Sequence, residues 1–237
     1  MWVGRVARAD GSVAVLKVAR RHFEAEHEAA GLRAWDGRGA VRLFESLSGD
    51  DVDVLLLEAC EPGTPASSLT EPAQDELVCA LLRRLWISPP ADGPFRPLAD
   101  MCDAWADGVD VVRATELLGD AGLVRAGTEL FRLLARDWSG PPVLLATDLH
   151  AGNVLAAARE PWLVIDPKPY VGDPTYDLTQ HMLNCTERLL ADPRGLATRL
   201  ASLADLEADR LRQWLLARCV VECDEQPHLA DVAHKVS

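Results

Sequence analysis

One stretch of the chain, from Pro141 to Pro174, interrupts the helical pattern of the residues before and after it. It contains three short apolar runs, PPVLLA, NVLAAA and PWLVI, which are separated or followed by Asp, His, Gly and Asn. Short buried strands that end in polar loops are typical of sites, because a rigid scaffold fixes where each loop begins. We therefore expect the functional side chains to lie in this stretch, inside a mainly helical region.

The first 60 residues have the pattern of a small sheet. WVGRVARA and SVAVLKVA alternate apolar and polar residues on either side of Asp10-Gly11, which predicts a hairpin with a two-residue turn. A helical pattern follows from Glu24 to Trp35 and ends near Gly37. VRLFES and VDVLLLEA then indicate two more strands.

Helical periodicity dominates after the segment EPGTP. It extends over three segments before the interruption, residues 72–86, 98–118 and 123–138, and resumes after Tyr176. The sequence predicts an α+β fold with two parts: a strand-rich part in residues 1–60 and a helical part in residues 61–237.

Composition excludes several classes of protein. No run of about 18 apolar residues is present, and the N-terminus lacks the apolar core of a secretory signal. The net charge of −13 argues against nucleic-acid binding; it would suit a cationic small molecule, or it serves solubility alone. The six cysteines are scattered without metal-binding spacing, so we expect a reduced, cytoplasmic protein that neither binds nor crosses a membrane.

Three polar residues of the interrupted stretch have the spacing of a phosphoryl-transfer site. Asp148 is followed five residues later by Asn153, and Asp166 comes thirteen residues after Asn153, at the end of an apolar strand. One loop can present a carboxylate to an acceptor hydroxyl and an amide oxygen to a metal ion. The neighbouring strand end can bring a second carboxylate beside that amide, so that the amide oxygen and this carboxylate both bind Mg²⁺.

A lysine and a glutamate near the N-terminus complete this pattern. Lys17 lies in the strand VAVLKV, and Glu28 follows it by eleven residues at the head of the helical stretch EAAGLR. A strand lysine held by a helix carboxylate aims its ammonium group at nucleotide phosphates. Glu24 and Glu26 are alternative partners for Lys17, and we favour Glu28.

These motifs resemble those of the aminoglycoside phosphotransferases, a family of the protein-kinase-like superfamily. The similarity is greatest to the streptomycin and hydroxyurea phosphotransferase branch, and it runs through VLKV, LLLEACEPG, LLATDLHAGNVL, WLVIDPKPYVGDPTYDL and WLLARC. It implies a bilobal kinase-like fold and ATP with Mg²⁺ as cofactors. It also implies transfer of the γ-phosphoryl group to a hydroxyl of an aminoglycoside or of hydroxyurea, which confers antibiotic resistance.

The same resemblance implies a role for each motif residue. Asp148 would be the catalytic base, Asn153 and Asp166 the magnesium ligands, Lys17 the contact to the α- and β-phosphates, and Glu28 the partner of Lys17. Four further residues would form the hinge whose backbone meets adenine: Leu57, Glu58, Ala59 and Cys60.

Two features depart from the commoner family pattern. Ala146-Thr147 stands where His-Gly usually precedes the catalytic Asp, so we expect a locally altered loop. Only nine residues precede Asp10-Gly11 and no glycine-rich loop is present, so we expect the small lobe to lack its first strand and its phosphate-covering flap.

Some interpretations stay open at this stage. A kinase for a sugar or another metabolite would use the same residues, and a pseudokinase-like module with impaired nucleotide binding would explain the short N-terminal part. Lys168 is close enough to Asp166 to touch phosphate, or it is a surface lysine. His150 would hydrogen-bond within the catalytic loop or lie near the metal.

Overall fold

Two segments that are far apart in sequence form the first structural unit of the chain. A computed structural model describes residues 1–237, and its contacts assign Met1–Phe95 and Leu144–Tyr170 to this unit. The second unit comprises Arg96–Val143 and Val171–Ser237. Neither unit ends near residue 60, and the lobe boundary expected there stays a prediction.

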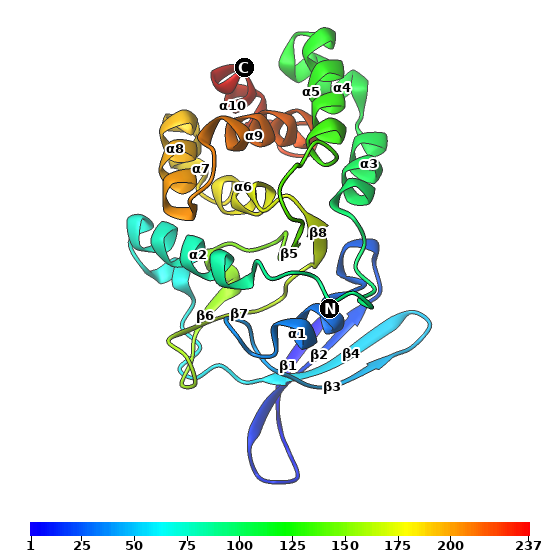
Figure 1. Ribbon diagram of the computed structural model, residues 1–237, viewed down its shortest axis with the longest axis vertical. Coiled ribbons are helices and arrows are strands. Elements are labelled where there is room, and N and C mark those ends of the chain that lie inside the picture. The colour runs from blue at the N-terminus through cyan, green and yellow to red at the C-terminus, as the bar shows by residue number, and fades with distance from the viewer. The chain divides into compact units, whose positions relative to one another are not determined.

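A four-stranded antiparallel sheet is the main β-structure of the first unit (Figure 1). Its strands are β1 (Trp2–Ala7), β2 (Val13–Arg20), β3 (Leu43–Ser48) and β4 (Val52–Glu58), in the order β1-β2-β4-β3. These are the strands that the alternating patterns predict. The two central strands are β2 and β4. They carry the buried apolar side chains Ala14, Leu55 and Leu57.

The hairpin between β1 and β2 is confirmed, but its turn is longer than expected. The N–H of Arg8 donates to the carbonyl of Ser12 at 2.8 Å, so three residues and not two form the loop. Gly11 has φ of +82°, a conformation that glycine adopts without a steric penalty. A left-handed glycine at the end of a three-residue hairpin loop is common, which explains why Asp10-Gly11 also fits this turn.

The helix that follows the hairpin starts later than the sequence pattern indicates. Residues Phe23–Ala25 form a short 3-10 turn, η1, and α1 spans Glu28–Trp35 against the sheet at β3. Its end is the predicted one, since Asp36 and Gly37 both have positive φ. The indole N–H of Trp35 donates to the carbonyl of Leu85 at 2.8 Å, which attaches α1 to α2 (Glu71–Leu85).

The remainder of the first unit contains the interrupted stretch found in the sequence. Strands β6 (Val154–Ala156) and β7 (Trp162–Val164) pair as an antiparallel hairpin, preceded by the turn η3 (Ala151–Asn153). A short pair, β5 (Val143–Leu145) and β8 (Tyr170–Gly172), lies where the chain enters and leaves this segment, and η2 (Ala66–Ser68) precedes α2. The prediction of short strands in this stretch is confirmed, and the contacts of Leu144–Tyr170 assign it to the unit that contains the four-stranded sheet.

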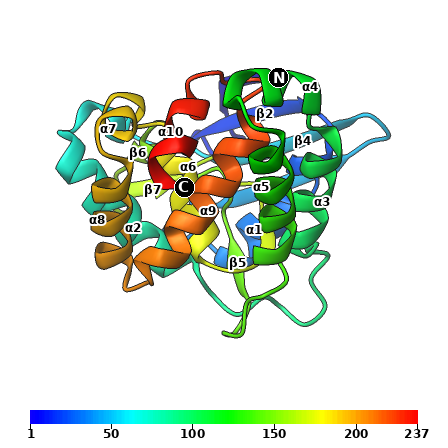
Figure 2. The ribbon, with the colours of Figure 1, turned by 90° about the horizontal axis from the view of Figure 1, so that it is seen from above.

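The second unit is helical, and α9 is its centre. The helices are α3 (Leu98–Gly108), α4 (Val111–Leu118), α5 (Ala121–Leu134), α6 (Thr175–Leu183), α7 (Thr186–Ala191), α8 (Pro193–Ala204), α9 (Ala208–Glu222) and α10 (Leu229–Val236). Figure 2 shows α9 running beside α5, with α8 and α10 against it. Leu211, Trp214 and Leu215 of α9 are fully buried, so this helix supplies much of the core of the unit.

A buried carboxylate holds α9 to the start of α6. Asp173 is fully buried, and its oxygens accept from the backbone N–H of Thr175 at 2.9 Å, the indole N–H of Trp214 at 2.6 Å and Nε of Arg210 at 2.6 Å. Two of these three partners lie on α9, more than 30 residues further along the chain, so they depend on tertiary packing. A buried charge is tolerated when it is paired and hydrogen-bonded, and Asp173 meets both conditions.

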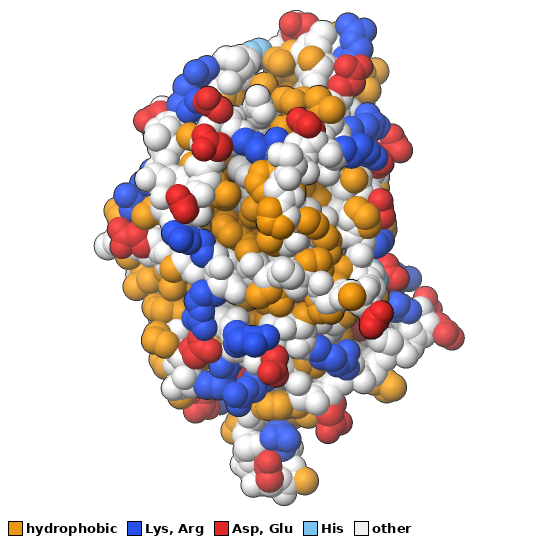
Figure 3. Space-filling model, in the orientation of Figure 1, with side chains coloured by type: hydrophobic (Ala, Val, Ile, Leu, Met, Phe, Trp, Pro, Cys, Tyr) orange, Lys and Arg blue, Asp and Glu red, His pale blue; other side chains and the backbone are white.

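All six cysteines are free and buried, namely Cys60, Cys79, Cys102, Cys185, Cys219 and Cys223. Burial raises the pKa of the Cys60 thiol to about 11. No helix has the length and apolar character needed to cross a bilayer. On the face drawn in Figure 3, acidic and basic side chains are interspersed, so the negative net charge does not appear there as one acidic field.

Candidate active site

The pairing of β6 with β7 brings two of the predicted metal ligands together. Val154 lies opposite Val164 in this hairpin, and the N–H of Ile165 donates to the carbonyl of Asn153 at 2.9 Å. Asp166 is the next residue after Ile165, so the register places the Asp beside the Asn even though thirteen residues separate them. The register of the β6–β7 hairpin therefore explains why Asp166 lies next to Asn153, the last residue of the D-x-x-x-x-N motif.

The loop from Asp148 to Asn153 is closed by its own hydrogen bonds. The side-chain amide of Asn153 donates to the carbonyl of Asp148 at 3.0 Å, and the N–H of Asn153 donates to the carbonyl of His150 at 2.9 Å. Nδ1 of His150 accepts from the N–H of Gly152 at 3.2 Å, which agrees with a role for His150 within the loop. Asp148 and Asn153 are thus fixed relative to each other.

The residue before Asp148 has an unusual backbone. Thr147 has φ of +48°, although only glycine takes this conformation without a steric penalty. Its hydroxyl donates to the carbonyl of Lys168 at 2.5 Å, and the N–H of Lys168 donates to the carbonyl of Ala146 at 2.9 Å. The two hydrogen bonds hold Thr147 in the left-handed region and tie the segment before Asp148 to the segment after Asp166.

Lys17 and Glu28 form a buried ion pair. Both residues are 5% exposed, and Nζ of Lys17 lies 2.8 and 2.6 Å from the two carboxylate oxygens of Glu28. Lys17 also donates to Asp166. Burial lowers the pKa of Lys17, but the charges of Glu28 and Asp166 outweigh that effect, so the pKa of Lys17 is raised and the side chain stays an ammonium.

Glu24, one of the alternative partners of Lys17, makes a different contact. Its Oε2 lies 2.9 Å from Nζ of Lys168, and the same nitrogen lies 3.2 Å from Oδ2 of Asp148. Burial lowers the pKa of Lys168, while Asp148 and Glu24 raise it to a larger extent, and the net direction is upward. The structure thus places Lys168 next to the predicted catalytic carboxylate and not at an isolated surface position.

The predicted hinge begins inside β4 and continues beyond it. The N–H of Glu58 donates to the carbonyl of Arg42 at 2.9 Å, so this part of the hinge belongs to the sheet. Ala59 and Cys60 follow the last residue of β4. The backbone groups that would meet adenine are therefore best sought at Ala59 and Cys60.

Arg159, in the turn between β6 and β7, fixes Glu58 of the predicted hinge. Its Nε and one terminal nitrogen each lie 2.8 Å from an oxygen of Glu58, and it also donates to the carbonyls of Gly37 at 2.6 Å and Ala40 at 3.1 Å. Sequence reasoning missed this residue. Its motif, AAAREPW, has the composition of an ordinary exposed turn, and no periodicity points to a partner 101 residues away.

The oxygen atoms present suit a magnesium ion. Mg²⁺ prefers hard oxygen ligands, and Asp166 supplies a carboxylate while Asn153 supplies an amide oxygen. The amide nitrogen of Asn153 is engaged with the carbonyl of Asp148, which leaves the amide oxygen as the atom that can bind a cation. Both residues fit the role that the sequence predicts for them.

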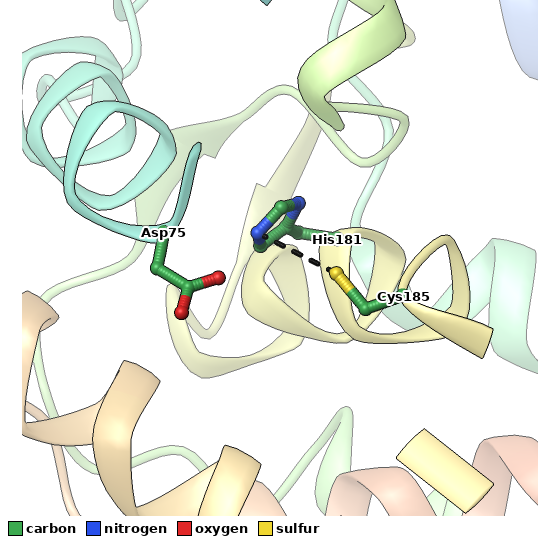
Figure 4. Close-up of side chains that lie close together, drawn as sticks. All are labelled: Asp75, His181 and Cys185. Atoms are coloured by element: carbon green, nitrogen blue, oxygen red, sulfur yellow. Dashed lines mark hydrogen bonds between the residues drawn. The ribbon is translucent and has the colours of Figure 1, made fainter. Parts of the chain in front are cut away.

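One other close pair has side chains of metal-binding type. Nε2 of His181, in α6, and Sγ of Cys185, two residues after that helix, lie 3.8 Å apart in the second unit (Figure 4). A structural zinc site takes four ligands, and one imidazole with one thiol does not reach that number. The pair is a buried hydrogen bond between two side chains.

Comparison with known proteins identifies the family. The sequence profile of a family described as aminoglycoside/hydroxyurea antibiotic resistance kinase matches residues 2–224. The chain belongs to this family.

Two curated phosphotransferases are 36% and 38% identical to the chain over the residues that align. Hydroxyurea phosphotransferase from Kitasatospora aureofaciens is 38% identical over 222 residues, which cover 92% of this chain and 63% of that protein. Streptomycin 6-kinase from Streptomyces griseus is 36% identical over 224 residues, which cover 90% of this chain and 70% of the relative. The chain thus spans about two thirds of the length of these relatives.

Solved structures confirm the predicted fold. An aminoglycoside phosphotransferase from Streptomyces rimosus, in complex with ADP and streptomycin, superposes with a TM-score of 0.57 at 20% identity and covers 96% of this chain and 89% of its own. Choline kinase LicA from Streptococcus pneumoniae superposes with a TM-score of 0.58 at 12% identity over 100% of this chain and 90% of its own. The kinase family member described here therefore has the protein-kinase-like α+β fold of the aminoglycoside phosphotransferases and choline kinases.

Proposed function

We propose that the chain transfers the γ-phosphoryl group of ATP to a hydroxyl group of a streptomycin-like aminoglycoside or of hydroxyurea. Family membership supports the reaction class. The observation that carries the proposal is structural: the hydrogen bond between Ile165 and Asn153 places Asp166 beside the loop of Asp148, while Lys17 contacts Asp166 and Glu28. Phosphoryl transfer requires a carboxylate, an oxygen-rich metal site and an ammonium group close together, and these residues supply all three.

Each side chain has a distinct task in this proposal. Asp148 accepts the proton of the attacking hydroxyl while the new bond from that oxygen to the γ-phosphorus forms and the bond to the β-phosphate oxygen breaks. Lys17 binds the α- and β-phosphates, and Glu28 keeps its ammonium group in place. Asn153 and Asp166 would hold Mg²⁺, which neutralises charge on the phosphates when it is bound.

The same proposal assigns adenine to the end of β4. Ala59 and Cys60 would offer backbone groups to the base, and the neighbouring Glu58 is fixed by Arg159 through two hydrogen bonds of 2.8 Å. A fixed hinge lowers the entropy that is lost when the nucleotide binds.

The test is transfer of labelled phosphate from ATP, with Mg²⁺, to streptomycin and hydroxyurea. We expect transfer by the unaltered chain and a fall in kcat of about 100-fold or more for Asp148→Asn, since a positioned general base contributes about 10²–10⁴-fold. Asp50→Asn, a change on an exposed turn, is the matched control and should leave kcat unchanged. Binding of ATP without transfer to either acceptor, or transfer that Asp148→Asn does not slow, would contradict the proposal.

A sugar or another metabolite is the alternative acceptor, because the residues discussed above act on the phosphoryl donor or on a hydroxyl group that any of these acceptors would offer. The same assay should include choline and hexoses. Transfer to one of these, with none to streptomycin or hydroxyurea, would keep the kinase chemistry and replace the acceptor.

A further inference from the structure

Lys168 occupies a place in the site that neither the magnesium nor the nucleotide assignment uses. Its Nζ lies 3.2 Å from Oδ2 of Asp148 and 2.9 Å from Oε2 of Glu24. An ammonium group has three N–H donors, so two are engaged by carboxylates that come from the two separate segments of the first unit. Because residues 24 and 148 are far apart in the sequence, the lysine side chain links two separate segments of the chain.

The backbone of Lys168 is fixed as well as its side chain. Its N–H donates to the carbonyl of Ala146 at 2.9 Å, and its carbonyl accepts from the hydroxyl of Thr147 at 2.5 Å. Both bonds lead to the residues that immediately precede Asp148. The ammonium group therefore approaches the carboxylate of Asp148 from a backbone that is itself attached to the Asp148 loop.

Residues on either side of Glu24 pack against the residues that follow Lys168. The neighbouring Phe23 has its carbonyl 3.5 Å from the hydroxyl of Tyr170, and the two rings pack with centroids 6.4 Å apart. Further along, Gly31 of α1 packs so closely on Pro169 that a Cβ at Gly31 would lie 2.5 Å from Cγ of the proline. The segment that contains Glu24 thus packs against Pro169 and Tyr170, the two residues that follow Lys168.

We propose that Lys168 is a positioning residue for Asp148, and that Glu24 positions Lys168. This inference rests on the phosphoryl-transfer function proposed above. Because Lys168 engages Oδ2 of Asp148, the other oxygen, Oδ1, is the one that receives the proton of the acceptor hydroxyl. A carboxylate fixed at one oxygen presents the second in a defined direction, and a misplacement of about 1 Å at such a group can reduce the rate by about 100-fold.

A role as a phosphate ligand makes different demands on the same lysine. In that case the ammonium would bind ATP, and its loss would raise the KM for ATP. Glu24 would then compete with the phosphate for Lys168, so neutralising Glu24 would improve ATP binding and not impair turnover. Positioning predicts a lower kcat for both variants with little change in the KM for ATP, because Glu24 and Lys168 act through Asp148.

Steady-state kinetics of four variants separate these cases, namely Lys168→Met, Lys168→Arg, Glu24→Gln and the double variant Glu24→Gln/Lys168→Met. For Lys168→Met we expect kcat to fall by about 10–100-fold with the KM for ATP within about twofold of the unaltered chain. Lys168→Arg keeps the charge and should recover most of kcat. Glu24→Gln should lower kcat by about 3–10-fold, and the double variant should be no slower than Lys168→Met, because residues that act as a unit are not additive.

Two controls and a folding check accompany these variants. Lys235→Met in α10 and Glu45→Gln in β3 remove the same kinds of charge elsewhere and should leave kcat and KM unchanged. Thermal unfolding identifies any variant that does not fold, and Lys168→Arg and Glu24→Gln still test the inference if Lys168→Met is unstable.

The outcomes distinguish this inference from the function on which it rests. If the unaltered chain transfers phosphate and Lys168→Met does so at the same kcat, or raises only the KM for ATP, the positioning role is wrong and the kinase function stands. Fully additive effects of the two single changes would also overturn it. If the unaltered chain transfers phosphate to no acceptor, the proposed function fails and the positioning role fails with it.

Discussion

Thr147 shows how a single side chain can replace the conformational freedom of glycine. Its left-handed backbone, with φ of +48°, precedes the predicted catalytic Asp148, at a position where the commoner family pattern has glycine. The hydroxyl of Thr147 donates to the carbonyl of Lys168 at 2.5 Å. The altered loop that the sequence predicts is thus a loop in which a hydrogen bond offsets backbone strain.

Two substitutions at Thr147 test this account. Thr147→Ala removes the hydrogen bond and keeps the strained conformation, whereas Thr147→Gly removes both. We expect Thr147→Gly to be more stable than Thr147→Ala by about 1 kcal/mol, the usual steric penalty of a left-handed residue that has a Cβ. Urea unfolding of both variants measures the difference, and an alanine variant as stable as the glycine variant would contradict it.

The ion pair of Glu58 with Arg159 gives stability a specific pH dependence. Burial alone would raise the pKa of Glu58, but hydrogen bonds and charge from Arg159 and Arg42 lower it further than burial raises it, so its pKa lies below that of an ordinary glutamate. The contribution is therefore complete above the unfolded pKa of about 4.3 and is lost as the pH falls through the lower folded value.

Comparison of the unaltered chain with Glu58→Gln isolates this contribution. We expect the glutamine variant to be less stable by about 1 kcal/mol at neutral pH, as for a charged hydrogen bond that is partly exposed. The gap should stay constant down to about pH 5 and shrink below about pH 4.3, as the carboxylate protonates. Urea unfolding at a series of pH values measures it, and a gap that widens towards acid pH would show that the sign is wrong.

At the scale of elements, α5 and α9 approach closely at one glycine. A Cβ placed on Gly127 of α5 would lie 2.7 Å from Cβ of Val220 in α9, a distance that real Cβ atoms do not reach. Val220 is β-branched and fully buried, so it has little freedom to move aside. The absence of a side chain at residue 127 is thus what lets the two helices pack at this separation.

Gly127→Ala should destabilise the second unit by about 1–3 kcal/mol, the usual effect of overpacking a core, in spite of the better helix propensity of alanine. Gly108→Ala is the matched control, because nothing lies within 4 Å of a Cβ at the last residue of α3. Chemical unfolding of the two variants measures both effects. Equal stability of the two would mean that α5 and α9 move apart without a penalty.

Sequence patterns predict most of the elements, and the misses have local causes. The helical stretch 98–118 is two helices, because the side chain of Asp110 caps a new helix by accepting from the N–H of Arg113 at 3.0 Å. The choice of Glu28 as the partner of Lys17 agrees with the contact in the structure. The contacts of Glu24 and Arg159 are invisible to periodicity, since each spans more than 100 residues of the chain and depends on tertiary packing.

At the scale of the whole molecule, all the residues predicted for catalysis, metal and nucleotide belong to one structural unit. They come from two stretches, Met1–Phe95 and Leu144–Tyr170, which are joined by hydrogen bonds of the backbone. The N–H of Val164 donates to the carbonyl of Gly39 at 2.9 Å, and the N–H of Val41 donates to the carbonyl of Val164 at 3.0 Å. A ligand held by these residues should stabilise the unit as a whole.

Nucleotide and metal should therefore raise the unfolding temperature together. ATP with Mg²⁺, at about 100 times its Kd, would add about 2.7 kcal/mol to the free energy of unfolding. We expect ATP with a chelator to give a much smaller shift, and Asp166→Ala to lose the difference between the two conditions. Differential scanning calorimetry measures this, and a shift that is independent of both Mg²⁺ and Asp166 would contradict the metal assignment.

The burial of all six cysteines makes the chain convenient for site-specific labelling. Cys60, whose thiol has its pKa raised to about 11 by burial, would carry about 100-fold less thiolate near pH 8 than an ordinary thiol. An added cysteine in the exposed turn between β3 and β4, as in Asp50→Cys, would then react far ahead of the native ones. A fluorophore attached there would report on the sheet of the first unit with every native thiol left in place.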